Sequence, residues 1–476
     1  MDDHVDRADS NITRRDFLKS ASLGALGLAL GSSAASWGSQ PGAAGKPGMP
    51  FLAIQTHAHD YLLEGAETVC RNVRERGGFN QMLFAATYVS EGKWTNHQPG
   101  NDYEVESGLY FEPDLKLYRD SGVTPRRAPS KGMEKYNALT EVSKAARKVD
   151  VGVHAWMSDY DQRLLAADYP ELRVVGPDGK PAASDWFCPN NPRARAYVVA
   201  LYEDVARNYD VDGFFMDRIR YDSPAGVCYC KWCRTAMAKR GFDADRLMAA
   251  MRRHASEPEL GDAFLSGGLS FDNAFERDDL VEIAQWIRFR QETVADHVAQ
   301  VRRLVRTLRP QWLIGLDLLG PYEGPQFGQN YSILARHCDW IKPMFYHHST
   351  ARDLRQWIEV RARMQGITPE QAYPQARALC LVQGVELPAT LDEFRVTGMP
   401  PHWALLQTKY VQGVVGGAAQ VYPGIQGWDP ATPEQIRAML NAVFDAGARG
   451  ITTYCYAEMT WEKIEVYRDV FKARFG

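Results

Sequence analysis

Short apolar runs alternate with helical patterns eight times between Phe51 and the C-terminus, and this alternation restricts the fold more than any other feature. Residues between the runs place apolar side chains at spacings of three and four, as amphipathic helices do. Strands that alternate with helices form parallel sheets, and eight such units predict an α/β protein with a (β/α)8 TIM barrel. A doubly wound sheet would instead show a glycine-rich phosphate loop after an early strand, and this sequence has none. The runs predicted to be strands are 51–54, 81–89, 151–156, 211–217, 312–316, 340–346, 414–422 and 450–456.

The predicted barrel occupies residues 49–476 and carries two insertions, at about 90–132 and 222–275. Connections of this length commonly fold over the mouth of a barrel. Residues 1–48 do not fit the barrel pattern. They contain Arg14 and Arg15, a weakly apolar stretch over 21–35 and a linker, and they resemble a twin-arginine export signal. The resemblance implies a periplasmic or secreted protein that uses the twin-arginine export machinery, with no membrane span once the signal is removed.

The charge balance excludes one class of partner. The chain has 55 basic and 59 acidic residues, for a net charge of −4, so nothing indicates binding to nucleic acid. Its 12 Trp, 22 Tyr and 19 Phe suffice both for core packing and for stacking on sugar rings. A carbohydrate is therefore a candidate partner, and the sequence indicates no oligomeric state.

Acidic residues follow several of the predicted strands, where barrel enzymes place their catalytic groups. Asp217 ends strand four, Asp317 ends strand five and Glu458 follows strand eight; further acids are Asp60, Asp159 and Asp161. Hydrolysis of a glycosidic bond needs two carboxyl groups, one as acid and one as nucleophile or base. We predict that Asp217 is catalytic, with Asp317 or Glu458 as its partner. Alternatively, some of these acids only bind rim arginines such as Arg218 and Arg220.

Histidines and aromatic residues near the same strand ends are predicted to contact the substrate, although aromatic residues there also serve as rim packing. His154 shares a face of strand three with Trp156, because side chains alternate along a strand. The predicted substrate-binding residues are His57, His59, His154, Trp156, Arg218, Tyr346, His347, Tyr422 and Tyr456.

Cys228, Cys230 and Cys233 lie within one short loop after strand four, and their C-x-C-x-x-C spacing is typical of a metal site. Together with Cys188 in a Cys-Pro-Asn-x-Pro context, this loop resembles the zinc site of family 42 glycoside hydrolases, which are β-galactosidases. The resemblance implies that the four cysteines bind a structural zinc ion. Two disulfides formed after export are the alternative.

Other segments resemble the family-10-like glycosyl hydrolases: Gly152–Trp156, Asp212–Tyr221 and Asp339–Tyr346. This resemblance implies a glycoside hydrolase. The family 42 mechanism does not transfer, since Met216-Asp217 replaces an Asn-Glu pair and strand seven lacks an acid. An aspartate ending strand four, with the acid/base on strand five, is closer to α-amylase-like enzymes.

Two other functions remain open. His57-Ala58-His59 after strand one resembles the metal-binding pair of the amidohydrolase superfamily, which would imply a metal-dependent hydrolase; of the other ligands, only His347 or His348 fits. A barrel that binds carbohydrate without hydrolysing it is the second alternative.

Overall fold

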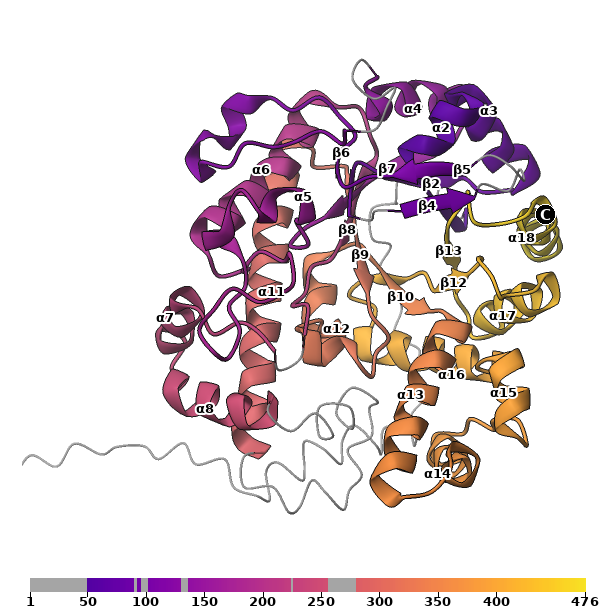
Figure 1. Cartoon of the computed structure of the whole chain (residues 1–476). Coiled ribbons are helices and arrows are strands. Elements are labelled where there is room, and N and C mark those ends of the chain that lie inside the picture. The colour runs from indigo at the N-terminus through magenta and orange to yellow at the C-terminus, as the bar shows by residue number, and fades with distance from the viewer. Residues whose placement is uncertain (1–48, 90–91, 96–101, 130–135, 224–225, 256–279) are drawn as a thin grey trace, which may run out of the picture. The chain divides into compact units, whose positions relative to one another are not determined.

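The computed structural model describes residues 49–89, 92–95, 102–129, 136–223, 226–255 and 280–476. The predicted export signal lies outside the described residues, as do parts of both insertions. Within the described chain, parallel strands lie at the centre and helices surround them (Figure 1).

Each strand of the central sheet pairs in parallel with the next one along the chain, and the last pairs with the first. This closed order confirms the predicted (β/α)8 barrel. The seventh position is shared by two short strands, β11 and β12, which both pair with β10. In barrel order, the strands are β1 (Phe51–Thr56), β2 (Gln81–Ala85), β7 (Gly152–Ser158), β8 (Gly213–Asp217), β9 (Leu313–Leu318), β10 (Trp340–Phe345), β11 (Gln420–Val421), β12 (Gly424–Gln426) and β13 (Gly450–Tyr454).

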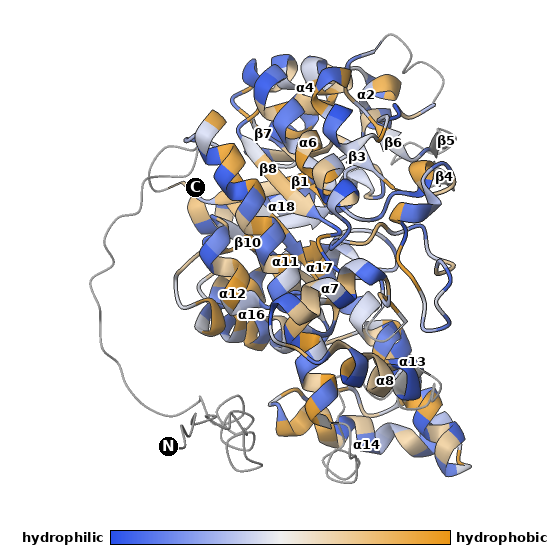
Figure 2. Ribbon diagram, turned by 90° about the vertical axis from the view of Figure 1, so that its left-hand side faces the viewer, coloured by the Kyte–Doolittle hydropathy of each residue, from blue (hydrophilic) through white to orange (hydrophobic). Residues whose placement is uncertain are grey.

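The helices between the strands carry apolar and polar residues on the same ribbon, as expected for a layer between core and solvent (Figure 2). The main α-helices are α2 (Ala58–Glu64), α3 (Ala66–Arg71), α4 (Ala138–Arg147), α5 (Arg163–Ala166), α6 (Pro192–Asn208), α7 (Lys231–Lys239), α8 (Ala244–Ala255), α11 (Leu280–Leu308), α12 (Tyr331–Leu334), α13 (His347–Gln365), α14 (Pro369–Val382), α15 (Leu391–Thr397), α16 (Pro401–Val415), α17 (Pro433–Asp445) and α18 (Trp461–Phe475). None of the helices in the described part is long and apolar enough to cross a membrane.

Two short antiparallel strand pairs and several short helices occupy the connections. The strand pairs are β3 (Thr87–Tyr88) with β6 (Gly108–Leu109), and β4 (Gly92–Thr95) with β5 (Asp102–Val105). β4, β5 and β6 lie in the predicted insertion after strand two, β3 lies in the run predicted as strand two, and α7 and α8 lie in the insertion after strand four. The short helices are the π-helix η1 (Asn72–Arg76) and the 3₁₀-helices η2 (Leu115–Ser121), η3 (Pro170–Leu172), η4 (Gly324–Phe327) and η5 (Ala335–His337).

Aromatic rings fill the lower barrel. Phe51 stacks on Tyr422 with ring centroids 4.5 Å apart, and Phe215 stacks on Trp340 at 5.3 Å. Gly315 makes room for these rings, because a Cβ there would lie 2.1 Å from the Trp340 indole. Because these rings form a packed floor inside the barrel, the polar side chains of the site lie toward the C-terminal ends of the strands.

The predicted bounds of strand seven, 414–422, were wrong. Residues up to Val415 belong to α16, and the helix ends at Gly416, whose φ of +58° favours glycine. The two short strands β11 and β12 then follow at 420–421 and 424–426. Tyr422 lies between them and stacks on Phe51, which is the first residue of β1, so it does not lie at the mouth of the barrel. The apolar run 414–421 joins the end of a buried helix to the start of a buried strand, and a short apolar run does not distinguish the two.

Candidate active site

Two of the predicted carboxyl groups lie at the same level on neighbouring strands. The last pair of residues between β8 and β9 is Met216 and Leu316, and the next residue in each strand is an aspartate, Asp217 or Asp317. Both side chains are almost fully buried, at 5% and 2% exposed. The fold therefore brings together one of the predicted catalytic pairs, Asp217 and Asp317.

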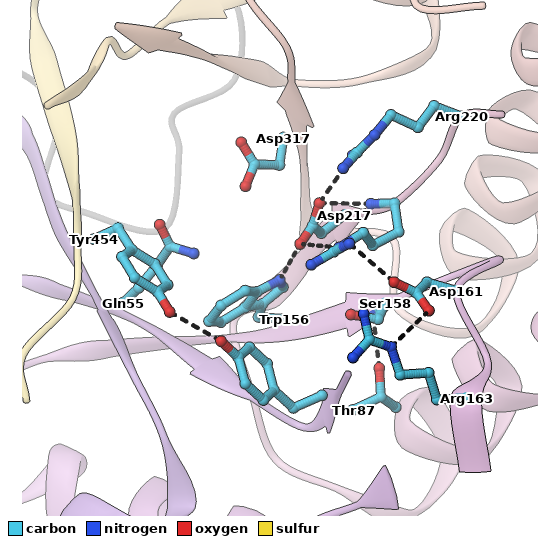
Figure 3. Close-up of polar contacts among 12 residues, drawn as sticks. Gln55, Thr87, Trp156, Ser158, Asp161, Arg163, Asp217, Arg220, Asp317 and Tyr454 are labelled. Carbon is cyan, nitrogen blue, oxygen red and sulfur yellow. Dashed lines mark hydrogen bonds and ion pairs between the residues drawn. The ribbon is translucent and has the colours of Figure 1, made fainter. Parts of the chain in front are cut away.

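The Asp217 carboxylate is held by groups from three directions (Figure 3). Its Oδ2 accepts a hydrogen bond of 3.1 Å from the Trp156 indole N–H, and its Oδ1 accepts one of 2.6 Å from the backbone N–H of Arg218. The guanidinium of Arg220 lies 3.5 Å from Oδ1. A carboxylate fixed by so many donors has little freedom to rotate.

The backbone at Arg218 is in a left-handed conformation, with φ of 57°. Residues other than glycine seldom adopt it, and such strain is concentrated at functional sites. Here it turns the Arg218 N–H onto Asp217 and directs the side chain to Asp161, at 2.9 Å. Because Asp161 is only 2% exposed, this ion pair fixes Arg218 beside the site.

The surroundings push the pKa values of the two aspartates in opposite directions. Burial raises the pKa of Asp217, but the cations of Arg218, Arg220 and Lys342 outweigh burial and leave that pKa below the usual carboxyl value. Burial dominates at Asp317, and despite the nearby Lys342 it raises the pKa of Asp317 to about 7. Asp217 is therefore ionised at neutral pH, whereas Asp317 changes its protonation state near neutral pH.

Lys342 is a site residue that the sequence analysis missed. Its ammonium group is fully buried and contacts three groups: Gln55 Oε1 at 2.7 Å, Asp317 Oδ2 at 3.1 Å and the Tyr346 hydroxyl at 2.6 Å. A lysine in the middle of the apolar run Trp340–Phe345 is the signal that could have identified it, because buried charges need partners.

Several predicted binding residues lie around this pair. Trp156 contacts Asp217, Tyr346 contacts Lys342, and Arg218 binds Asp161. The His57 ring lies against the rings of Trp156 and Tyr88, at 5.5 and 4.5 Å. Burial lowers the pKa of His57 to about 3, with a further contribution from His59, so its ring is neutral.

Other predicted residues lie elsewhere. His154 is in the lower barrel, where its Nε2 lies 3.1 Å from Gln81 Oε1, and burial lowers its pKa to about 4. The Tyr456 hydroxyl points to Glu64, at 3.0 Å, and to Asn72. His59 lies against the Tyr110 ring, and His347 against the ring of His348.

The third predicted carboxyl group, Glu458, contacts neither aspartate. Its Oε1 accepts a hydrogen bond of 3.3 Å from the Cys455 thiol, and burial raises its pKa to about 7. Asp60 accepts a hydrogen bond of 2.8 Å from the backbone N–H of His57 at the start of α2. Asp159 is buried against His297, at 2.6 Å. These acids are bound by other groups, which leaves Asp217 and Asp317 as the pair on neighbouring strand ends.

The four predicted metal-binding cysteines are gathered in one cluster. Their sulfur atoms all lie within 4.8 Å of one another, and Cys188 Sγ lies 3.6 Å from Cys230 Sγ and 3.5 Å from Cys233 Sγ. A tetrahedral zinc ion with Zn–S bonds of about 2.3 Å places its sulfurs about 3.8 Å apart. The cluster therefore fits a metal ion, and all four cysteines are free thiols in the structure.

N–H groups from the surrounding chain point at these sulfurs. Val175 N–H donates to Cys228 at 3.3 Å, and the Asn190 amide donates to Cys233 at 3.4 Å and to the Tyr221 hydroxyl at 3.0 Å. Such donors orient and stabilise thiolate ligands. The cluster thus ties the loop after β8, which carries Arg218 and Arg220, to the segment before α6.

The cysteine cluster is the only set of three or more His, Cys, Asp or Glu ligands that converges within the described residues. His57 and His59 are not part of such a set. The pattern that resembles an amidohydrolase metal pair therefore lacks, in the part that the structure describes, the further ligands that such a site uses.

Comparison with known families gives a match over more than half of the chain. The family model described as glycosyl hydrolase-like 10 matches residues 121–375. This range contains Asp217, Asp317, Lys342 and the four cysteines.

Solved structures share the barrel fold. The PgaB (BpsB) glycoside hydrolase domain from Bordetella bronchiseptica is 13% identical, with a TM-score of 0.51 over 90% of this chain and 98% of that domain. The β-galactosidase from the psychrophilic Marinomonas ef1 is 12% identical, with a TM-score of 0.51 over 89% of this chain and 59% of the enzyme. At these identities the likeness concerns the fold alone.

Curated relatives match over shorter stretches. A poly-β-1,6-N-acetyl-D-glucosamine N-deacetylase from Escherichia coli strain K12 is 24% identical over 221 residues, which are 44% of this chain. An S-layer-related protein from Niallia circulans is 26% identical over 155 residues, or 32% of this chain. The matches span 29% and 9% of the length of these relatives, so their full activities do not carry over.

Proposed function

Because the chain belongs to the glycosyl hydrolase-like 10 family, we propose that it is an exported glycoside hydrolase in which Asp217 and Asp317 cleave the bond. The observation that carries this proposal is the opposite shift of two pKa values at one site. Asp217 is held ionised by cations, whereas burial raises the pKa of Asp317 to about 7. Pairs of carboxyl groups whose surroundings push their pKa values apart are characteristic of acid/base assignments.

In the proposed reaction, the Asp217 carboxylate attacks the anomeric carbon while Asp317 donates its proton to the glycosidic oxygen, which leaves with the departing sugar. A water molecule then attacks the glycosyl–Asp217 ester, and Asp317 takes up the proton of that water. Trp156, Arg218 and Arg220 orient Asp217, and Lys342 orients Asp317.

The register of the two strands favours retention of the anomeric configuration. Neighbouring strands lie about 4.8 Å apart. Retaining glycosidases hold their carboxyl groups about 5–5.5 Å apart, and inverting enzymes about 6.5–9.5 Å apart to leave room for water. Asp217 and Asp317 follow directly on the paired residues of β8 and β9, which supports the shorter separation.

A panel of glycosides and oligosaccharides tests the reaction class. One relative is named for poly-β-1,6-N-acetyl-D-glucosamine, so oligomers of that sugar belong in the panel beside common α- and β-linked oligosaccharides. Release of reducing ends by the mature protein, linear in enzyme concentration, is the expected result. A protein that binds members of the panel without cleaving them would fit the carbohydrate-binding alternative instead.

Replacement of Lys342 by Met tests the electrostatics of the acid. The ammonium group of Lys342 lowers the pKa of Asp317, and a neighbouring opposite charge typically accounts for a shift of about 1–3 pH units. In Lys342→Met the pKa of Asp317 should rise, so we expect the alkaline limb of the pH profile of kcat/KM to move to higher pH by at least about one unit. An unchanged alkaline limb in a folded variant would remove Lys342 from this role.

We further propose that the cysteine cluster binds one zinc ion in a structural role. Four thiolates complete a tetrahedral zinc shell and leave no open position for substrate or water. Zinc bound there would hold the loop after β8 in place, since Asn190 links the cluster to Tyr221. This role is compatible with binding of zinc by the four thiols in the cytoplasm, before the protein is exported.

Replacement of Cys230 by Ser is expected to abolish stoichiometric zinc and to destabilise the fold, because loss of a structural metal is among the largest single-residue effects, about 4 kcal/mol or more. Metal analysis of the purified protein should give one zinc per chain. Cys380, a half-buried thiol outside the cluster, provides a matched control: Cys380→Ser should retain both the zinc and the apparent Tm. Zinc-free wild-type protein with two disulfides would contradict the metal assignment.

The export proposal rests on the first residues of the chain. We expect the double substitution of Arg14 and Arg15 by Lys to retain the protein in the cytoplasm, because the arginine pair is the feature that the twin-arginine machinery recognises. Cell fractionation of a bacterial host that expresses the full chain measures this. Unchanged export of the double variant would exclude this route.

A further inference from the structure

Arg220 is a nearly buried cation that makes few contacts. Only 12% of its side chain is exposed, and Figure 3 shows its guanidinium directed at Asp217. Among the residues that the structure describes, its only hydrogen bond or ion pair is this one, at 3.5 Å from Asp217 Oδ1. A guanidinium has five N–H donors, and buried polar groups in native proteins are nearly always paired. The unused donors of Arg220 therefore indicate an acceptor that a ligand supplies beside Asp217.

The packing of Arg220 restricts the shape of that acceptor. The guanidinium lies over the ring of Trp186, 5.5 Å from the ring centroid. A guanidinium that stacks on an aromatic ring keeps its N–H edge free for a partner in its own plane. The fork of donors along this edge matches the two oxygens of a carboxylate, which it binds with two parallel hydrogen bonds. The arrangement thus favours a carboxylate over a single hydroxyl group.

The formal charges at the site also favour an anion. Three cations act on Asp217, namely Arg218, Arg220 and Lys342. Arg218 has a separate ion pair with Asp161, at 2.9 Å. Lys342 loses its counter-ion when its acidic partner on β9 carries the proton that the proposed reaction requires. One positive charge then remains uncompensated, and an anionic substrate compensates it.

Glu323, a half-buried residue after β9, is the other carboxyl group whose charge interacts with Arg220. In the described part of the chain, no ion pair joins the two residues. Burial, with a contribution from Asp353, raises the pKa of Glu323 to about 7, although Arg220 acts in the opposite direction. Below that pH Glu323 is mostly neutral, so it does not supply the charge that Arg220 lacks.

We propose that the sugar unit bound at Asp217 and Asp317 is a hexuronic acid and that its carboxylate binds Arg220. The inference rests on the proposed function and names its class of substrate, an acidic glycan. In a hexuronic acid, only the ring oxygen and C5 separate the anomeric carbon from the carboxyl carbon. A cation beside the nucleophile can therefore reach this carboxylate. The charge of Arg220 also offsets the repulsion between the substrate carboxylate and Asp217.

Calorimetric titration with matched acids and esters tests this recognition. The full chain carrying Asp317→Asn is used, because the amide mimics the protonated acid, leaves the charge of Asp217 in place and slows cleavage. The ligands are the tetramers of α-1,4-linked galacturonic acid, β-1,4-linked mannuronic acid and β-1,4-linked glucuronic acid. Each is compared with its methyl ester, which lacks the charge on the same sugar chain. Arg220→Gln and Arg220→Lys are made in this background, and Arg303→Gln, at an exposed position on α11, is the matched control.

For at least one acid, we expect the tetramer to bind at least about tenfold more tightly than its methyl ester, which is the contribution of a hydrogen bond to a charged group. This difference should disappear in Arg220→Gln, persist in part in Arg220→Lys and remain unchanged in Arg303→Gln. A purely structural role of Arg220 would instead weaken the binding of acid and ester alike. Equal affinity for acid and ester in all three series, a difference that survives Arg220→Gln, or no binding of any acid would overturn the proposal.

The two proposals fail in different ways. Preferential binding of an acid that depends on Arg220, without cleavage of any glycoside by wild-type protein, would reject the hydrolase while the recognition of a carboxylate stands. Cleavage by wild-type protein that is confined to neutral glycosides would reject the acidic substrate while the hydrolase stands.

Discussion

Replacement of Asp217 by Asn is expected to lower kcat by about 10⁴-fold or more on any glycoside that the wild-type protein cleaves, because the variant lacks the proposed nucleophile. The amide is nearly isosteric with the carboxylate, and its single oxygen can still accept one of the two hydrogen bonds, either from Trp156 or from the Arg218 backbone N–H. The fold and the substrate affinity should therefore change little. Initial rates at saturating substrate, with circular dichroism and zinc content of the same preparation, measure the effect.

Asp120 offers a matched control for this substitution. It is an exposed aspartate at the end of η2, so Asp120→Asn removes one negative charge without touching the barrel mouth. It should leave kcat unchanged. If folded Asp217→Asn protein kept more than about a tenth of the wild-type rate, Asp217 could not be the nucleophile.

Replacement of Asp317 by Asn is expected to lower kcat by about 10²–10⁴-fold on natural glycosides, which is the usual contribution of a general acid. The loss should depend on the leaving group. A dinitrophenyl glycoside needs no proton on its departing oxygen, so the variant should cleave it at a rate much closer to that of the wild type. Comparison of kcat/KM for the two classes of substrate separates proton donation from a general loss of structure.

The pH dependence of kcat/KM in the same variant provides a second test of Asp317 as the general acid. Asp317 must be protonated to act as an acid, and its pKa is raised to about 7, so wild-type kcat/KM should be high below pH 7 and fall above it. The pKa of Asp217 is lowered, so the acid limb should lie below the usual carboxyl range. In Asp317→Asn the alkaline limb should disappear for the dinitrophenyl glycoside. An alkaline limb that persists near pH 7 would assign it to another group, such as Glu458, whose pKa is also raised to about 7.

Much of the barrel could be predicted from local patterns. Strand four stood out because the apolar run Gly213–Met216 stops at Asp217, and the structure ends β8 at that residue. The helices Leu280–Leu308 and Trp461–Phe475 are recognisable in the sequence in the same way, because both have clear apolar periodicity. The cysteine cluster was recognisable since three of its members lie within six residues.

The errors at the site come from contacts between distant segments. Lys342 donates a hydrogen bond to Gln55 across the barrel, and no sequence pattern near either residue predicts that contact. The roles of the rim acids also depend on such partners: Asp159 binds His297 of α11, whereas Asp317 contacts Lys342 of β10 and has a raised pKa. Alternation along strand three correctly placed His154 and Trp156 on one face, but could not show that His154 lies in the packed floor and Trp156 at the site.

Proton NMR of the cleavage reaction tests the central claim most directly, because it records in one experiment whether the bond is broken and which anomer appears first. The proposed pair, with Asp217 as nucleophile and Asp317 on the adjacent strand, predicts that the first sugar released retains the configuration of the substrate. An inverted anomer as the first product would contradict the direct attack by Asp217. The absence of cleavage across the whole panel would contradict the assignment of the aspartate pair to glycoside hydrolysis.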